Sequence, residues 1–218
     1  MPTGYRKAVD LPLVVPVFPL DGALLLPGGQ LPLNIFEPRY LNMIDDAMAG
    51  DRLIGMVQTR GGERDAPGLA RVGCVGRITS FAETADGRYL ISLTGLCRFA
   101  VGEELPVRTP YRQVRAQFDR FERDLRPGED TAAGLDKQEF LTALGHYLEH
   151  RGLGIEWEAA QSAPVDALIN SLAMGLPFDA AEKQALLEAP TLEDRAATLT
   201  ALLEIDAAGG DGPPPAVQ

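Results

Sequence analysis

The sequence predicts an α+β protein, with a β-rich barrel carrying one inserted helix in the N-terminal half and a bundle of helices after it. Short apolar segments separated by Gly, Pro and Asp turn signals fill residues 10–118. From residue 135 onward, apolar residues recur at helical spacing. The length of 218 residues and the hydrophobic content of 45% are those of a globular chain that buries a core without disulfides or metals.

The N-terminal half contains several candidate strands. The first is the apolar run 11–20, whose prolines suit an edge strand or a bulge rather than a central strand. Pro27-Gly28-Gly29 predicts a turn between two apolar segments, and Asp86-Gly87 predicts a hairpin between two strands. Residues 113–118 alternate between apolar and polar, as in a half-buried strand. Residues 61–68 are rich in glycine and charge, so we expect a polar loop there.

One helix is expected inside this β-rich half. Pro38 suits the first turn of a helix, where the N–H that proline lacks would have no partner in any case. Gly50 is the expected end of the helix. The apolar residues at helical spacing between them are Tyr40, Leu41, Ile44 and Met48. Strands with turn signals and one inserted helix indicate a small, partly closed barrel.

The second half is predicted to be helical. Residues 119–134 are charged and contain Pro and Gly, so we expect them to form a connector. Residues 135–206 are predicted to form a helical bundle. Its helices are expected to start near Asp136, Pro164, Asp179 and Thr191. The tail 207–218 has almost nothing to bury and is predicted to be disordered.

The charge is concentrated in the second half and argues against two classes of partner. The net charge is −11, of which −1 falls on residues 1–110 and −10 on residues 111–218. An acidic chain repels phosphate, which argues against nucleic acid and anionic membranes as partners. No signal peptide or membrane span is recognisable, and the two cysteines, Cys74 and Cys97, are predicted to be free buried thiols. A cytoplasmic location is therefore expected.

The search for catalytic motifs predicts no catalytic residues, no metal and no cofactor. The phosphate loop, the dinucleotide-binding glycine motif and the G-x-S-x-G nucleophile motif are all missing from the sequence. One string, His146-Tyr147-Leu148-Glu149-His150, matches the H-x-x-E-H zinc-protease signature. The apolar stripe of the same predicted helix places both histidines on the opposite, solvated face, so a surface helix is the preferred interpretation. A nucleophilic role for Cys74 would need a neighbouring histidine, and both histidines lie in the other half.

A series of motifs in the first half resembles a known family. Phe18-Pro-Leu is followed by Leu26-Pro-Gly-Gly-Gln-Leu-Pro-Leu-Asn-Ile-Phe-Glu-Pro-Arg-Tyr40. Later come Arg52-Leu-Ile-Gly-Met-Val-Gln58, Val72-Gly-Cys-Val-Gly-Arg-Ile78 and Asp86-Gly-Arg-Tyr-Leu-Ile-Ser-Leu-Thr-Gly-Leu-Cys-Arg-Phe99. Together they closely resemble the Lon N-terminal (substrate-binding) domain family, in order, over residues 10–118.

The resemblance implies a PUA-like β-barrel followed by a helical bundle. It also implies a role in recognising unfolded or partner polypeptides, as this region does in ATP-dependent Lon proteases. The chain lacks the phosphate loop of the Lon ATPase and its protease module, so it resembles a stand-alone bacterial form of the domain. We therefore expect a non-enzymatic polypeptide-binding module, and proteolysis is not carried over.

The motif residues have two interpretations, one structural and one functional. Phe36 is expected in the core, Glu37 at a helix start, and Arg39 and Tyr40 between helix and barrel. As the alternative, Glu37, Arg39 and Tyr40 are candidate peptide-binding residues. Sheet edges, a groove between the barrel and the helical bundle, and the loop 61–68 are further candidates for a binding site.

Two further expectations concern partners. PUA-like barrels can bind RNA, so an RNA-binding module is the alternative function, against which the net charge of −11 argues. The near-neutral barrel half and the apolar content permit a homodimer without requiring one.

Overall fold

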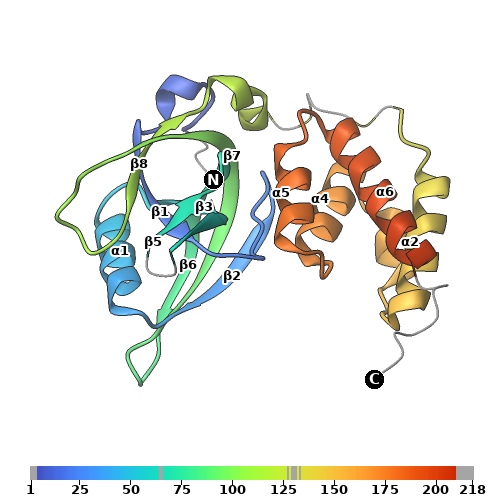
Figure 1. The fold of residues 1–218 in the computed structure, drawn as a ribbon, viewed down its shortest axis with the longest axis horizontal. Coiled ribbons are helices and arrows are strands. Elements are labelled where there is room, and N and C mark those ends of the chain that lie inside the picture. The colour runs from blue at the N-terminus through green and yellow to red at the C-terminus, as the bar shows by residue number, and fades with distance from the viewer. Residues whose placement is uncertain (1–3, 64–65, 127, 129–131, 133, 210–218) are drawn as a thin grey trace. The chain divides into compact units, whose positions relative to one another are not determined.

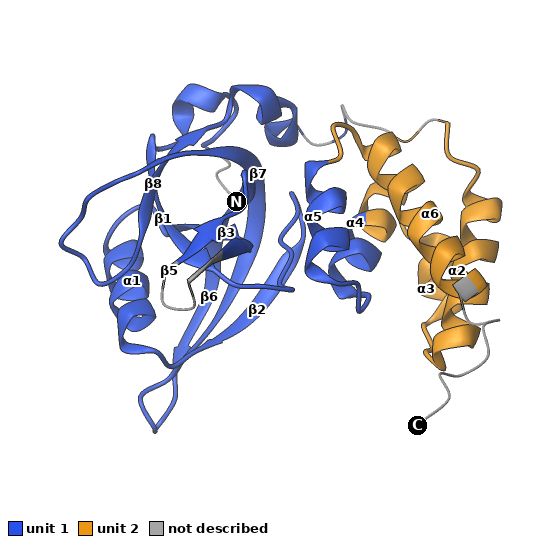
Figure 2. Cartoon of the chain, in the orientation of Figure 1, with its two compact units in different colours: residues 1–130, 170–188 blue, residues 131–169, 189–218 orange. Residues whose placement is uncertain are grey.

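The computed structural model describes residues 4–63, 66–126, 128, 132 and 134–209 of the chain (Figure 1). The chain divides into two compact units (Figure 2). The first comprises residues 1–130 and 170–188, and the second comprises residues 131–169 and 189–218. Strands lie in the first unit and helices lie in both, which confirms the predicted α+β class.

The first unit is built on a six-stranded sheet in the order β2-β7-β6-β3-β1-β8. Its strands are β1 (Val14–Pro19), β2 (Gln30–Ile35), β3 (Leu53–Val57), β6 (Val72–Glu83), β7 (Tyr89–Glu104) and β8 (Gln113–Gln117). Because β8 also pairs with β7, the pairings β7-β6-β3-β1-β8 return to β7 and form a closed ring. β2 pairs with β7 outside this ring.

β1 lies between two strands although it contains Pro16 and Pro19, contrary to the prediction of an edge strand. The reason is that its two ends use different partners. Val14 to Pro16 pair with β8, whereas Val17 to Pro19 pair in parallel with β3. Each proline therefore lies in a half of the strand that pairs with one neighbouring strand, so a missing N–H need not break a ladder on both sides.

The inserted helix and the hairpin turn form where the sequence predicts them. α1 (Pro38–Ala49) begins at the proline, and Gly50 follows its last residue. β6 and β7 form a long hairpin, and Gly87 in its turn has a φ of 79°, which glycine adopts without strain. Near this turn, Tyr89 to Thr94 of β7 pair with β6 on one side and with β2 on the other.

Six residues of the expected polar loop 61–68 belong to strands. Residues 61–63 and 66–68 lie in a two-stranded antiparallel sheet made of β4 (Thr59–Glu63) and β5 (Ala66–Leu69), and residues 64 and 65 lie outside the described residues. Asp21 anchors the start of this hairpin, since its carboxylate accepts hydrogen bonds from the Thr59 N–H at 2.8 Å and from the Thr59 hydroxyl at 2.6 Å. Backbone pairing thus outweighs the weak strand propensity of the glycines.

The expected connector 119–134 contains a buried element. A 3₁₀ helix, η2, spans Asp119–Leu125, and its Phe121 is buried. Asp124 of η2 forms a bidentate ion pair with Arg98 of β7, with both N···O distances 2.9 Å. This part of the connector is therefore packed against the sheet.

Residues 170–188 belong to the first compact unit, whereas the sequence places them in a helical bundle over 135–206. They include the end of α4 (Val165–Gly175) and all of α5 (Ala180–Glu188). Buried polar groups hold α5 in this unit. The Lys183 ammonium donates to the Gly22 carbonyl at 2.8 Å, and the Gln58 amide donates to the Ala180 carbonyl at 3.0 Å.

The second unit contains α2 (Lys137–Arg151), α3 (Trp157–Ser162) and α6 (Leu192–Gly209), and α2 packs on α6. The predicted helix starts are confirmed by their caps: Asp136 accepts from two N–H groups of α2, and Thr191 caps α6 together with Asp194. In the first unit, Asp179 and Glu182 form the same kind of reciprocal cap for α5. The short helix α3 is not among the helices that the sequence predicts.

The sequence predicts that residues 207–209 belong to a disordered tail, 207–218, but they form the end of a helix. α6 continues through Gly209, and residues 210–218 lie outside the described residues. No helix among the described residues is long and apolar enough to cross a membrane.

Arg52, between α1 and β3, has a φ of 62° in the left-handed region. We expect Arg52→Gly to raise the free energy of unfolding by about 0.5–1 kcal/mol. The left-handed backbone costs a residue with a Cβ about 1–2 kcal/mol, and glycine relieves this strain. The relief outweighs the larger conformational entropy that glycine loses on folding. Urea denaturation followed by far-UV circular dichroism measures the change. Arg52→Ala keeps the Cβ and should give no such gain; an equal gain in both variants would contradict the explanation.

Candidate functional site

The predicted binding residues Glu37, Arg39 and Tyr40 lie together at the start of α1. Glu37 occupies the N-cap position, but its side chain does not cap the helix. Its carboxylate instead pairs with the Arg39 guanidinium, with an N···O distance of 2.8 Å. Both side chains are about half exposed, so this ion pair is open to solvent.

Tyr40 is buried, unlike its two neighbours. Its ring lies 4.1 Å, centroid to centroid, from the ring of Phe18 on β1, and burial raises the pKa of its hydroxyl. The Arg39 guanidinium also lies over the Tyr40 ring, 4.6 Å from its centroid. Tyr40 therefore anchors α1 to the sheet and supports Arg39.

Phe36 is exposed, and the prediction that it belongs to the core is wrong. Its exposed fraction is 63%, whereas the preceding Ile35 is 2% exposed. Ile35 ends β2 facing the interior, so the next side chain points the other way before α1 begins. The Arg88 guanidinium lies 5.9 Å from the Phe36 ring centroid. We call Phe36, Glu37, Arg39 and Arg88 the Phe36 surface.

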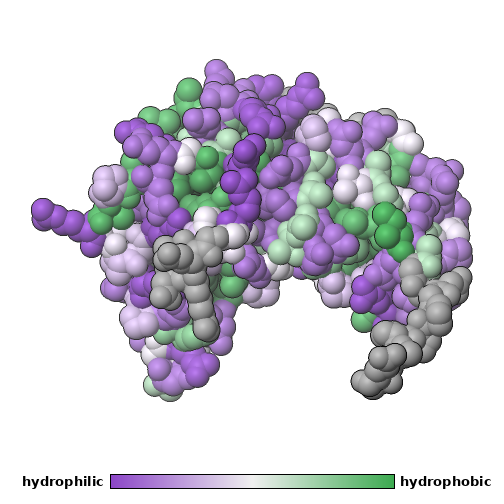
Figure 3. All heavy atoms as spheres, in the orientation of Figure 1, coloured by the Kyte–Doolittle hydropathy of each residue, from purple (hydrophilic) through white to green (hydrophobic). Residues whose placement is uncertain are grey.

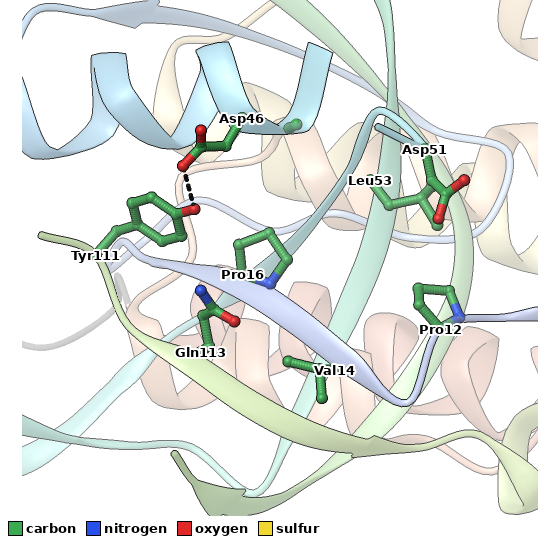
Figure 4. Close-up of a pocket in the computed structure, with 9 residues that line it drawn as sticks. Pro12, Val14, Pro16, Asp46, Asp51, Leu53, Tyr111 and Gln113 are labelled. Carbon is green, nitrogen blue, oxygen red and sulfur yellow. Dashed lines mark hydrogen bonds between the residues drawn. The ribbon is translucent and has the colours of Figure 1, made fainter. Parts of the chain in front are cut away.

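A second candidate is a groove of about 200 Å³ at the other end of α1 (Figure 4). Its apolar part comes from the segment leading into β1 and from β1 and β3, and its polar part comes from α1, the turn after it and the start of β8. The lining residues are Pro12, Val14, Pro16, Asp46, Ala47, Asp51, Leu53, Tyr111 and Gln113.

The polar side of the groove is organised by a short hydrogen bond. The Tyr111 hydroxyl donates to the Asp46 carboxylate at 2.6 Å. Burial, and then this bond to a carboxylate, raise the pKa of Tyr111 to about 12. Tyr111 therefore stays neutral at physiological pH, and its bond fixes the start of β8 to α1.

Reasoning from the sequence does not find this groove. Its residues come from separate segments of the chain, and apart from Leu53 none belongs to the motifs quoted above. One signal is present: Asp45 and Asp46 near the end of the predicted helix, with Asp51 shortly after it. Acidic residues are unfavourable at a helix C-terminus, so their presence there calls for an explanation.

The H-x-x-E-H string lies on an exposed helix face. His146, Glu149 and His150 are all exposed on α2, and His150 lies 3.3 Å from the Asp206 carboxylate on α6. Within the described residues, no group of three or more His, Cys, Asp or Glu side chains could hold a metal ion. Cys74 and Cys97 are buried and are not joined in a disulfide, and burial raises the pKa of Cys97, which keeps this thiol protonated.

A sequence model of the ATP-dependent protease La (LON) substrate-binding domain matches residues 14–204. The chain belongs to this family. The match extends beyond the motifs of the first half and includes most of the helical second half. The Lon substrate-binding domain thus accounts for both compact units.

Lon proteases are among the relatives of this domain. Lon protease 2 of Myxococcus xanthus is 28% identical over 211 residues, which cover 93% of this chain and 25% of the relative. Lon protease of Anaeromyxobacter dehalogenans is 34% identical over 111 residues, which cover 50% of this chain and 13% of the relative. The chain therefore spans about a quarter or less of the length of these relatives.

Two solved structures share the fold of this Lon substrate-binding domain. A Lon N-terminal domain protein from Xanthomonas campestris gives a TM-score of 0.61 at 23% identity, covering 86% of this chain and 97% of that one. The N-terminal domain of the Mycobacterium avium complex Lon protease gives a TM-score of 0.63 at 18% identity, covering 88% and 98%. At these identities the likeness concerns the fold alone.

Proposed function

We propose that this chain is a polypeptide-binding module without catalytic activity of its own, which recognises unfolded segments or a partner protein. The observation that carries the proposal is the match of a substrate-binding domain family to residues 14–204. The substrates of proteases are polypeptides, so a substrate-binding domain of this family is a binder of polypeptide. Exposed apolar side chains beside charged ones are a feature that such a binder can use.

We propose the Phe36 surface as one contact region for that polypeptide. Phe36 offers an exposed aromatic ring, and Glu37 and Arg39 offer a carboxylate and a guanidinium beside it. Aromatic and arginine side chains contribute most to many protein interfaces. Tyr40 acts here as a positioning residue, because its buried ring holds Arg39 in place.

Exposed apolar residues occur elsewhere as well, so the proposal needs a control. Figure 3 shows hydrophobic areas separated by hydrophilic side chains on the visible face. Trp157 of α3 is 41% exposed and is a comparable aromatic side chain outside the Phe36 surface. Scattered exposed apolar residues are normal on protein surfaces, so exposure alone does not make Trp157 a contact.

The experiment measures binding of fluorescently labelled, reduced and carboxymethylated α-lactalbumin by anisotropy. The wild-type chain should bind this unfolded protein and leave native α-lactalbumin unbound. The Phe36→Ala/Arg39→Ala variant should bind it about tenfold or more weakly, since loss of an aromatic and an arginine anchor has effects of this size. Trp157→Ala should bind as the wild type does.

Two outcomes would count against these proposals. If the wild-type chain binds native and unfolded protein equally, or neither, the polypeptide-binding function is wrong. If Trp157→Ala weakens binding as much as the double variant, the Phe36 surface is not the contact region. Circular dichroism of each variant confirms that the fold is retained.

A further inference from the structure

We propose that the groove at the C-terminal end of α1 binds an extended polypeptide segment in which an apolar side chain lies next to a lysine or arginine. This inference rests on the proposed polypeptide-binding function and defines the class of segment that is bound. Three features of the groove carry it: its size and apolar lining, the electrostatics of the helix end, and one carboxylate without an ion-pair partner among the described residues.

The size and lining of the groove suit a single apolar side chain. Its volume of about 200 Å³ is below the range of about 300–1,000 Å³ that is typical of pockets for small-molecule ligands. Pro12, Val14, Pro16 and Leu53 form its apolar part.

The electrostatics at this end of α1 favour a cation. The C-terminal end of a helix carries a partial negative charge. The last turn of α1 contains no basic residue to offset it, and Asp45 and Asp46 lie at this end instead. Asp51 follows in the turn to β3 and lines the groove with Asp46. Carboxylates at this position are unfavourable for the helix itself, but they are favourable for a bound positive charge.

Asp51 is the carboxylate available to a ligand. Asp45 accepts a hydrogen bond from the Tyr89 hydroxyl at 3.0 Å, and Asp46 accepts one from the Tyr111 hydroxyl at 2.6 Å. Asp51 is exposed, and it forms no ion pair within the part of the chain that the structure describes. In Figure 4 its carboxylate lies beside Leu53 and near Pro12, next to the apolar part of the groove.

These positions define the order of groups on the ligand. The apolar side chain would occupy the space between Val14 and Leu53, and the neighbouring lysine or arginine would reach Asp51. In an extended chain, side chains two residues apart lie on the same face, so a segment with an apolar residue at one position and a lysine or arginine two positions along can place both groups in this way without a folded structure of its own. The groove would therefore select segments that combine an apolar with a basic side chain over segments that carry only one of the two.

The test uses three short labelled peptides with a common Gly/Ser background. In the Leu-Lys peptide the two residues are separated by one glycine, so that both side chains lie on one face of an extended chain. The Leu-Glu and Ser-Lys peptides have the same spacing, and binding to the full chain is measured by fluorescence anisotropy. The wild-type chain should prefer the Leu-Lys peptide over both others. Raising the NaCl concentration should weaken this binding, because exposed charges are screened by salt.

Variants of the groove make the test specific. Asp51→Asn should weaken binding of the Leu-Lys peptide by about two- to fivefold, as expected for loss of one exposed ion pair. Asp51→Lys should reverse the preference toward the Leu-Glu peptide. Glu149→Gln on α2 removes an equal charge from an exposed residue outside the groove, and should leave binding unchanged.

The outcome distinguishes the groove from the general function. If the chain binds unfolded α-lactalbumin but shows no preference among the three peptides, or if Asp51→Lys does not reverse the preference, the groove inference is wrong and the polypeptide-binding function stands. If the chain binds neither the peptides nor the unfolded protein, both proposals fail. Reduced binding by Glu149→Gln equal to that of Asp51→Asn would indicate a general charge effect and would also overturn the inference.

Discussion

Asp124→Ala should lower the free energy of unfolding by about 3–5 kcal/mol, because it leaves the buried Arg98 guanidinium without its carboxylate. The side chains of Arg98 and Asp124 are 2% and 6% exposed. Asp124 accepts hydrogen bonds from Nε, Nη2 and the backbone N–H of Arg98, each at 2.9 Å. Arg98 also donates to the Leu187 carbonyl at 3.2 Å, so one guanidinium joins β7, η2 and α5.

The measurement is urea denaturation followed by far-UV circular dichroism, which reports on the helices and strands of both units. Trp157, the only tryptophan of the chain, lies in the second compact unit, so its fluorescence follows that unit separately. Asp119→Ala is the matched control: it removes an exposed carboxylate from the same element, and such changes usually alter stability by less than about 0.5 kcal/mol.

A second control separates the cost of an unpaired charge from the value of the pair. Replacing both residues, as in Arg98→Met/Asp124→Leu, removes the two buried charges together, and should recover much of the stability lost in Asp124→Ala. A loss below about 1 kcal/mol in Asp124→Ala would contradict the prediction, since buried unpaired charges cost more than that.

Gly95→Ala should destabilise the sheet by about 3 kcal/mol, at the upper end of what overpacking a core costs. A Cβ at this position would lie 2.8 Å from the Leu26 carbonyl carbon and 3.3 Å from Leu25 Cγ. The Leu26 carbonyl is backbone and cannot rotate away as the end of a side chain can. Gly95 also exchanges backbone hydrogen bonds with Gly28 and Gly29, at 3.0 and 2.9 Å, which a shifted segment would lose.

The same denaturation experiment measures the effect of Gly95→Ala, and two other glycines calibrate it. Gly76 pairs directly with Gly95, but a Cβ there would meet the flexible end of Leu25, at 2.6 Å, so Gly76→Ala should cost less. A Cβ at Gly4 would have no atom within 4 Å, so Gly4→Ala should be close to neutral. Equal losses at Gly95 and Gly4 would refute the packing explanation.

The contacts of Gly95 and Arg98 explain in physical terms why a glycine and an arginine occupy these two positions of a motif. Gly95 and Arg98 both belong to the segment from Asp86 to Phe99 that resembles the Lon family. The pair of glycines at positions 76 and 95 leaves room for residues 24–26, which are buried but form no strand. Arg98 supplies the buried charge that binds η2 and α5 to the sheet.

Local signals in the sequence are sufficient for several elements. Pro38 and Gly50 mark the ends of α1, and Asp86-Gly87 marks the hairpin turn. The caps at Asp136, Asp179 and Thr191 mark helix starts. In each case the group that stabilises the element lies within a few residues of it, so the pattern can be read from the sequence.

Other features depend on partners far away in the sequence. Phe36 resembles a core residue because it is aromatic and follows a strand, yet the face that it occupies is open to solvent. α5 resembles part of the helical bundle, but Lys183 and Gln58 tie it into the unit of the sheet through contacts that no local pattern reveals.

The amino-acid sequence was enough to establish the α+β class, the order of most elements and the family to which the chain belongs. Three-dimensional contacts were needed to establish which strands close the ring, which charges are buried and where a groove lies. The physical reason is that hydrogen bonds of turns and caps are local, whereas burial and ion pairing depend on contacts between residues that are distant along the chain, such as Arg98 and Asp124.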